Sequence, residues 1–222
     1  NTNAYLDLKE YLGFGHALDG EAITLLNTIA RFDERVLERL DIDLRHVFLR
    51  GPRNYTRVIA ADGSFRDEWG VGYVVRGPYN ERVGHPLADA TMSDLDTYAW
   101  PDADDPGRTE GLAEEVTRLF EETDYALASC AVTSGFFQVC WNLRGMEQFL
   151  IDMAAAPDFA EALLERTLGA EIAQFQRLLQ AVGPSIEMAE TADDIATQRG
   201  PLISPAMYRR YLKPRQTRLN AA

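Results

Sequence analysis

Two adjacent carboxylates, Asp193 and Asp194, are the residues of this sequence best placed to do chemistry. They follow the apolar run 186–188, typical of a strand, and precede Ser204, a favoured helix N-cap that is followed by proline. In α/β proteins, functional side chains gather where a strand ends and the next helix begins. The pair therefore predicts catalytic residues that orient a substrate or support a metal ligand. The structural alternative is that one carboxylate caps a turn or pairs with Arg199 while the other is solvated.

Four further side chains are candidates for binding a substrate. Gln198 could hydrogen-bond to a ligand or hold its own loop. Trp141 and Phe136 could form an apolar wall over the substrate, although aromatic residues at helical spacing also build cores. Arg50 could bind a carboxylate or phosphate, or be a solvated surface residue. His85, which precedes a proline, is expected to pack its loop rather than to act as a base.

Charge and composition exclude several classes of partner. The net charge of −13 argues against nucleic acid and against anionic membrane surfaces, which both require basic patches. No apolar run approaches 18 residues, and the first residues lack the basic start and apolar core of a secretory signal. Cys130 and Cys140 lie in apolar surroundings, so we expect buried, reduced thiols in a cytoplasmic protein. These cysteines and the three histidines do not have the spacing of metal ligands.

Strand-length apolar runs alternate with helical periodicity along the chain. This alternation predicts an α/β fold with a mainly parallel sheet and right-handed crossovers, but it cannot separate an open sheet from a closed barrel. The turn at 62–63 predicts a hairpin between 57–60 and 71–75. We expect helices at 5–12, 21–40, 111–122, 136–143, 146–155 and 158–182, and further strands at 44–49, 125–132 and 185–188.

Several segments resemble the uroporphyrinogen decarboxylase superfamily, which includes the cobalamin-dependent methyltransferases. Residues 193–205 carry its acidic pair, its Thr-Gln step and the run Gly-Pro-Leu-Ile-Ser-Pro, and residues 141–150 resemble another of its segments. Residues 85–87 and 101–106 resemble the methyltransferase branch. The resemblance implies a (β/α)8 TIM barrel. We expect one partial barrel domain over residues 1–222, incomplete at both ends, with an inserted hairpin and loop region around 55–106.

Departures from the superfamily pattern argue against porphyrinogen decarboxylation. No N-terminal arginine-rich motif is present. Arg50 stands where the decarboxylases place an aspartate that accepts hydrogen bonds from pyrrole N–H groups, and a guanidinium cannot accept them. Trp141 replaces an expected tyrosine.

The resemblance therefore implies a zinc- and corrinoid-linked methyltransferase that acts on a small methylated substrate or thiol. The corrinoid would be carried by a partner protein, and the zinc ligands would lie beyond residue 222, so no metal ligand is assigned within 1–222. A homodimer is a further implication. The alternatives are a uroporphyrinogen III decarboxylase, which needs neither metal nor cofactor, and a non-catalytic barrel module.

Overall fold

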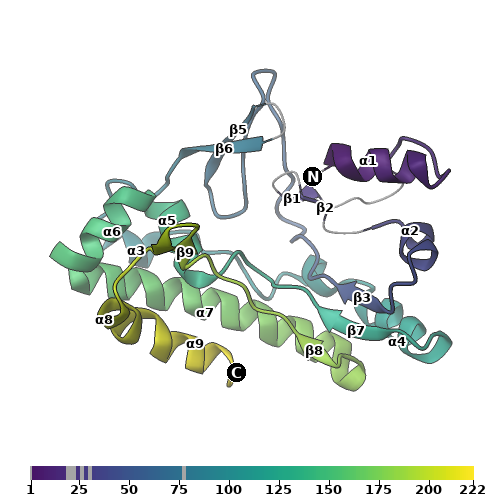
Figure 1. Ribbon diagram of the computed structural model, residues 1–222. Helices are drawn as coiled ribbons and strands as arrows, with labels where there is room; N and C mark the ends of the chain where they lie inside the picture. Colours follow the sequence, from purple (N-terminus) through teal and green to yellow (C-terminus); the bar gives the residue numbers. More distant parts are fainter. Residues whose placement is uncertain (1, 19–23, 26–27, 30–31, 77–78) are drawn as a thin grey trace.

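The structure is a computed structural model with a mixed α/β fold (Figure 1). It describes residues 2–18, 24–25, 28–29, 32–76 and 79–222. In its parallel sheet, β7 (Ala126–Ser129) lies between β3 (Leu44–Val47) and β8 (Met188–Ala189). The predicted parallel sheet is thus confirmed. Within the described residues this sheet has three strands, and closure into a barrel is not shown.

Two helices pack on this sheet and complete its hydrophobic core. Helix α4 (Leu112–Glu122) precedes β7, and the long helix α7 (Pro157–Val182) leads into β8. Both helices were expected from their apolar spacing, and Pro157 opens α7 at the first helical position, where its missing N–H group costs nothing. The residues that join the sheet to these helices are apolar and buried: Val47, Leu112, Val116, Leu127, Leu178 and Val182.

A second and larger core lies at the other end of α7. There α7 packs against α5 (Phe136–Arg144) and α6 (Met146–Ala155), as Figure 1 shows. Gly145 separates α5 from α6 because it adopts a φ of 90°, which other residues rarely tolerate. Phe137 and Phe149 are both fully buried, so these aromatic side chains stabilise the core by packing.

An antiparallel sheet is inserted between β3 and β7. It consists of β4 (Ser64–Arg66), β5 (Gly72–Arg76) and β6 (Tyr79–Gly84), with β5 in the middle. The predicted hairpin is therefore present, but its first strand was placed wrongly at 57–60. The turn instead leads into β4, because the Asp62 carboxylate accepts a hydrogen bond from the Ser64 N–H group at 2.9 Å.

The prediction of one helix over 21–40 is wrong for the described residues. Strands β1 (Thr24–Leu25) and β2 (Thr28–Ile29) form a short antiparallel pair, and α2 covers Glu34–Arg39 alone. Asp33 starts α2 because its carboxylate accepts a hydrogen bond from the Arg35 N–H group at 3.0 Å. The other parts of the prediction, 21–23, 26–27 and 30–31, lie outside the described residues.

The C-terminal helix begins as expected but is not regular. The Ser204 hydroxyl caps α8 (Pro205–Met207) by accepting a hydrogen bond from the Met207 N–H group at 3.2 Å. A π-helical turn, η3 (Tyr208–Leu212), then leads into α9 (Lys213–Leu219). Pro214 explains this turn, since proline cannot donate the next helical hydrogen bond and its ring crowds the preceding turn.

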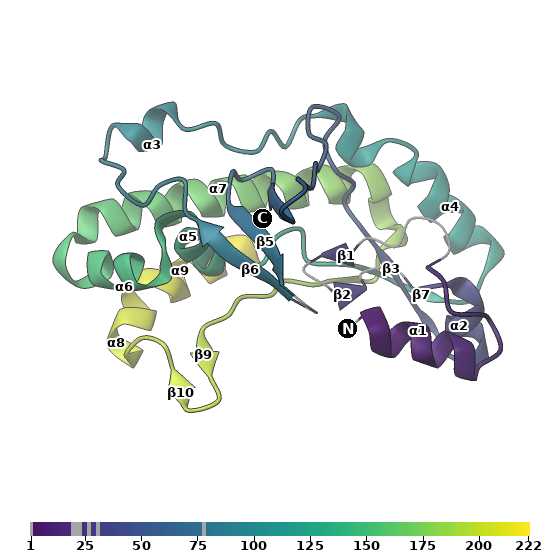
Figure 2. The same cartoon turned by 90° about the horizontal axis from the view of Figure 1, so that it is seen from above.

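The remaining elements are short. No helix in the described ranges is long and apolar enough to cross a membrane. Figure 2 shows the β9–β10 hairpin projecting beside α8. These elements are α1 (Thr2–Tyr11), α3 (Asp94–Thr97), η1 (Pro106–Thr109), η2 (Gly183–Ser185), β9 (Ala196–Thr197) and β10 (Gly200–Pro201).

A buried ion pair ties α5 and α6 to the loop that follows β6. Arg144 Nε donates to Asp152 at 2.7 Å, and Arg144 Nη1 donates to the carbonyl oxygens of Leu87 and Ala90. We expect Asp152→Ala to lower the free energy of unfolding by about 3 kcal/mol, because it leaves a buried guanidinium without its carboxylate. Urea unfolding at pH 7, followed by circular dichroism, measures this change.

The matched control is Glu161→Ala, which removes a carboxylate from the exposed ion pair with Arg210. Exposed pairs contribute little, so a loss below about 1 kcal/mol is expected. Equal losses in the two variants would show that burial does not decide the strength of the Arg144–Asp152 pair.

Candidate functional site

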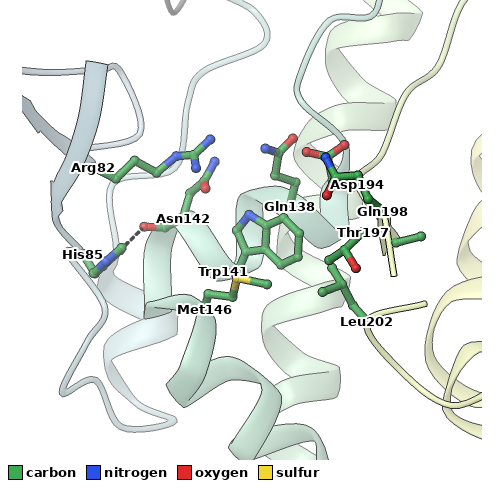
Figure 3. A pocket seen from close by; sticks show the side chains of 11 residues that line it. Arg82, His85, Gln138, Trp141, Asn142, Met146, Asp194, Thr197, Gln198 and Leu202 are labelled. Atoms are coloured by element: carbon green, nitrogen blue, oxygen red, sulfur yellow. Dashed lines mark hydrogen bonds between the residues drawn. The ribbon is translucent and has the colours of Figure 1, made fainter. Parts of the chain in front are cut away.

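A pocket of about 770 Å³ lies between the inserted sheet, α5 and the segment that follows β8 (Figure 3). Its volume falls in the range of small-molecule sites. α5 comes after β7, and the third wall comes after β8, so two walls follow the carboxyl ends of parallel strands. The lining residues are Arg82, His85, Gln138, Trp141, Asn142, Met146, Asp194, Ala196, Thr197, Gln198 and Leu202.

Helix α5 presents one face to the pocket. Gln138, Trp141 and Asn142 all line it, and their spacing of three and four residues places them on the same side of a helix. Trp141 keeps 7% of its surface exposed and packs against Phe137, with ring centroids 5.3 Å apart. The helix therefore supplies both an apolar wall and two amide groups.

The orientation of His85 is fixed by its hydrogen bond to α5. Nδ1 of His85 lies 2.8 Å from the backbone carbonyl oxygen of Asn142. A carbonyl oxygen can only accept, so Nδ1 carries a hydrogen. In the neutral ring Nε2 is then the acceptor. The His85 side chain thus packs its loop against α5, as predicted, and also forms part of the pocket wall.

The segment after β8 brings the predicted Asp194 and Gln198 to the pocket. Gln198 lies between β9 and β10, and the short pairing of these strands holds it in place. The side chains of both residues are exposed, and Figure 3 shows them on the side of the pocket opposite Arg82. Asp194 and Gln198 therefore lie where a ligand can reach them.

Asp193 has a different place. Its carboxylate accepts hydrogen bonds from the N–H groups of Phe137 and Gln138, both at 2.9 Å, and so caps the start of α5. Burial raises the pKa of this carboxyl to about 6, although the two N–H groups act in the opposite direction. The segment after β8 is thereby joined to α5.

Two other predicted residues lie away from the pocket. Phe136 is 1% exposed, and it lines a separate cavity of about 180 Å³ beside α9. The Arg50 guanidinium pairs with Glu115 at 2.9 Å. The structure therefore brings together Asp194, Gln198 and Trp141, while Asp193 lies directly behind them.

Sequence reasoning missed several lining residues. Gln138 and Asn142 could have been found from Trp141, because they share its helical face. Arg82 gave no such signal, since it belongs to the inserted sheet, whose position relative to α5 depends on long-range packing. The described residues contain no group of three His, Cys, Asp or Glu side chains that could hold a metal ion.

Comparisons with known proteins support the fold. No protein-family model and no curated protein matches the sequence. Among solved structures, a methyltransferase from Methanosarcina mazei is similar, with a TM-score of 0.62 and 19% sequence identity. The match covers 97% of this chain and 58% of that chain, so this sequence spans little more than half of the matched protein. The mixed α/β fold with a parallel sheet is therefore shared with a methyltransferase structure.

Proposed function

We propose that this protein is a methyltransferase of the uroporphyrinogen decarboxylase superfamily, linked to zinc and to a corrinoid on a partner protein. The observation that carries the proposal is the fold, which matches a methyltransferase structure over 97% of the chain. The pocket supports it, because it lies where the loops after parallel strands hold the sites of such folds. The sequence resemblance points to the same branch.

The lining of the pocket suits a small methyl-bearing substrate. Trp141, Met146 and Leu202 supply apolar surface against which methyl groups can pack. Methyl transfer requires the donor carbon and the attacking atom to be held in line at short range, which is a matter of positioning. The residues of this chain would therefore bind and orient the substrate and exclude water from it.

The described residues do not by themselves form a zinc site. Burial raises the pKa of the Cys140 thiol, and burial followed by the charge of Glu190 raises that of Cys130, so neither is a ready thiolate. Zinc would lower the pKa of a bound thiol in such an enzyme. In the proposed enzyme the zinc ligands would therefore lie outside residues 1–222.

The test uses the natural full-length protein with methylcobalamin and a small thiol. In this reaction the methyl group passes from cobalt to sulfur, the thiol proton goes to solvent, and cob(I)alamin remains. The absorbance change of the corrinoid and the zinc content of the purified protein are measured. The proposal expects turnover and bound zinc. A protein that is free of metal and inactive in this assay, or that converts uroporphyrinogen to coproporphyrinogen, would contradict it.

A substitution in the pocket wall tests whether methyl transfer takes place in this pocket. We expect Trp141→Leu to lower kcat/KM by about tenfold or more, because the flat wall that positions the substrate is lost. Trp100→Leu is the control, since Trp100 packs against Tyr98 and Trp69 outside the pocket. If the two variants lose activity equally, the pocket is not the site of methyl transfer.

A further inference from the structure

Opposite charges face each other across the pocket. Figure 3 shows the Arg82 guanidinium on the side of the inserted sheet and the Asp194 carboxylate on the opposite side. Both side chains are exposed, and within the described part of the chain neither has an ion-pair partner. Other arginines near the inserted sheet are paired, for example Arg76 with Glu81 and Arg108 with Glu68. Arg82 hydrogen-bonds to the neutral Tyr73 hydroxyl, so among the described lining residues neither this arginine nor the Asp194 carboxylate is neutralised by an ion pair.

Asn142 provides an independent sign that a polar ligand belongs here. Its side chain is 7% exposed and lines the pocket, and Oδ1 has no hydrogen-bond partner within the described ranges. Buried polar atoms in native proteins are normally paired, so an unpaired one at a pocket wall marks a place for polar contacts. Oδ1 is an acceptor, so it can take a hydrogen bond from a water that also donates to the carboxylate of a ligand, but it cannot bond to that carboxylate directly. Figure 3 shows this amide on the same side of the pocket as Arg82.

The space between the two charges holds the Gln138 amide and an apolar wall (Figure 3). Trp141 forms this wall, and Met146 and Leu202 lie beside it. An aromatic face attracts quaternary ammonium groups, and a nearby carboxylate adds to this attraction. A guanidinium suits a carboxylate, because its N–H groups can donate two parallel hydrogen bonds to the carboxylate oxygens. The three parts together match a molecule with a methylated cation at one end and a carboxylate at the other.

We propose that the pocket binds a small zwitterion, with its quaternary ammonium group between Trp141 and Asp194 and its carboxylate at Arg82. One methyl group of the ammonium would then pass to the cob(I)alamin of the partner protein. The C–N bond would break with its electron pair left on nitrogen, which gives the tertiary amine, and a C–Co bond would form, so this assignment rests on the proposed function. A molecule with only a positive charge meets repulsion from Arg82, and one with only a negative charge meets repulsion from Asp194. The charge pair thus selects against both.

Three probes of nearly equal size separate these cases. Trimethylglycine carries both charges, 3,3-dimethylbutanoate replaces the ammonium nitrogen with carbon, and choline replaces the carboxylate with a hydroxymethyl group. Isothermal titration calorimetry on the natural full-length protein measures their dissociation constants. We expect trimethylglycine to bind at least about tenfold more tightly than either singly charged probe, because it makes one more charge contact with the pocket than either of them.

Two variants that each remove one charge test which pocket residue contacts which end of the ligand. Arg82→Gln should weaken trimethylglycine about tenfold and leave choline unweakened, and Asp194→Asn should weaken both trimethylglycine and choline. The matched controls are Arg76→Gln on the inserted sheet and Asp89→Asn on the following loop, which change the net charge equally outside the pocket. Neither control should alter any of the three constants.

The outcomes separate this inference from the proposed function. Equal binding of 3,3-dimethylbutanoate and trimethylglycine, undetectable binding of all three probes, or an Arg82→Gln variant that behaves like its control would overturn the zwitterion assignment. Binding needs no methyl transfer, so selective binding without turnover would refute the proposed function alone. Turnover of other methyl donors without selective binding would refute the zwitterion assignment alone.

Discussion

Replacing Gly135 with alanine is expected to lower the free energy of unfolding by about 3 kcal/mol or more. Gly135 precedes α5 and has a φ of 95°, a conformation that costs other residues about 1–3 kcal/mol. An alanine Cβ would also lie 2.3 Å from the Ala192 carbonyl oxygen and 2.4 Å from Asp193 Cγ. Both contacts are too short, so the segment after β8 would have to move away.

This movement would also reach the cap of α5. Asp193 can accept two N–H groups of α5 because Gly135 has no side chain in the way. An alanine would therefore remove hydrogen bonds as well as add strain. Urea unfolding at pH 7 measures the loss, and trimethylglycine titration tests whether the adjacent Asp194 has shifted.

Gly169→Ala is the matched control for this substitution. Gly169 is exposed within α7, and a Cβ built there has nothing within 4 Å. Alanine is favoured over glycine inside a helix, so this variant should be more stable by about 0.5–1 kcal/mol. A Gly135→Ala variant within 1 kcal/mol of the wild type would contradict the close packing of the two segments.

The sequence carries enough local information to predict the helices around the pocket. Gly145 and Pro157 mark the boundaries of α5, α6 and α7, and both act as expected. Local periodicity failed at 21–40, where the β1–β2 pair and the Asp33 cap replace a continuous helix. Propensity is a weak signal wherever capping and strand pairing can compete with it.

The candidate site likewise has residues that local sequence signals predict and residues that depend on long-range packing. Asp194, Gln198 and Trp141 could be predicted because strand ends and aromatic helix faces are local features. The distant partners were not predictable. Glu115 pairs with Arg50, and the approach of Arg82 to α5 depends on how an inserted sheet packs. The cap role of Asp193 likewise requires knowing that the segment after β8 touches the start of α5.

Beneath this contact lies a buried carboxylate. Glu171 on α7 has no exposed surface, and no cation forms an ion pair with its carboxylate in the described part of the chain. Burial raises its pKa to about 7, and the nearby charge of Asp193 adds to the rise, while hydrogen bonds from the Thr133 side chain and the Phe136 N–H group act in the opposite direction. The folded protein thus holds a proton at Glu171 that the unfolded chain, with a carboxyl pKa of 4.5, releases more easily.

Glu171 should make the protein less stable as the pH rises from about 4.5 to 7. The folded state binds more protons than the unfolded state in this window, so the free energy of unfolding falls with pH and the loss is complete above pH 7. Asp193, with its pKa raised to about 6, acts in the same direction between about 3.8 and 6.

Glu171→Gln is therefore expected to stabilise the protein at pH 8 by on the order of 3 kcal/mol, because a neutral amide replaces a buried charge. At pH 4.5 the variant and the wild type should be nearly equal. Urea unfolding between pH 4.5 and 8 measures both. Glu161→Gln, an exposed change on the same helix, should shift stability by less than about 1 kcal/mol at every pH. A Glu171→Gln variant that is less stable than the wild type at pH 8 would mean that the ionised carboxylate is paired in the folded protein.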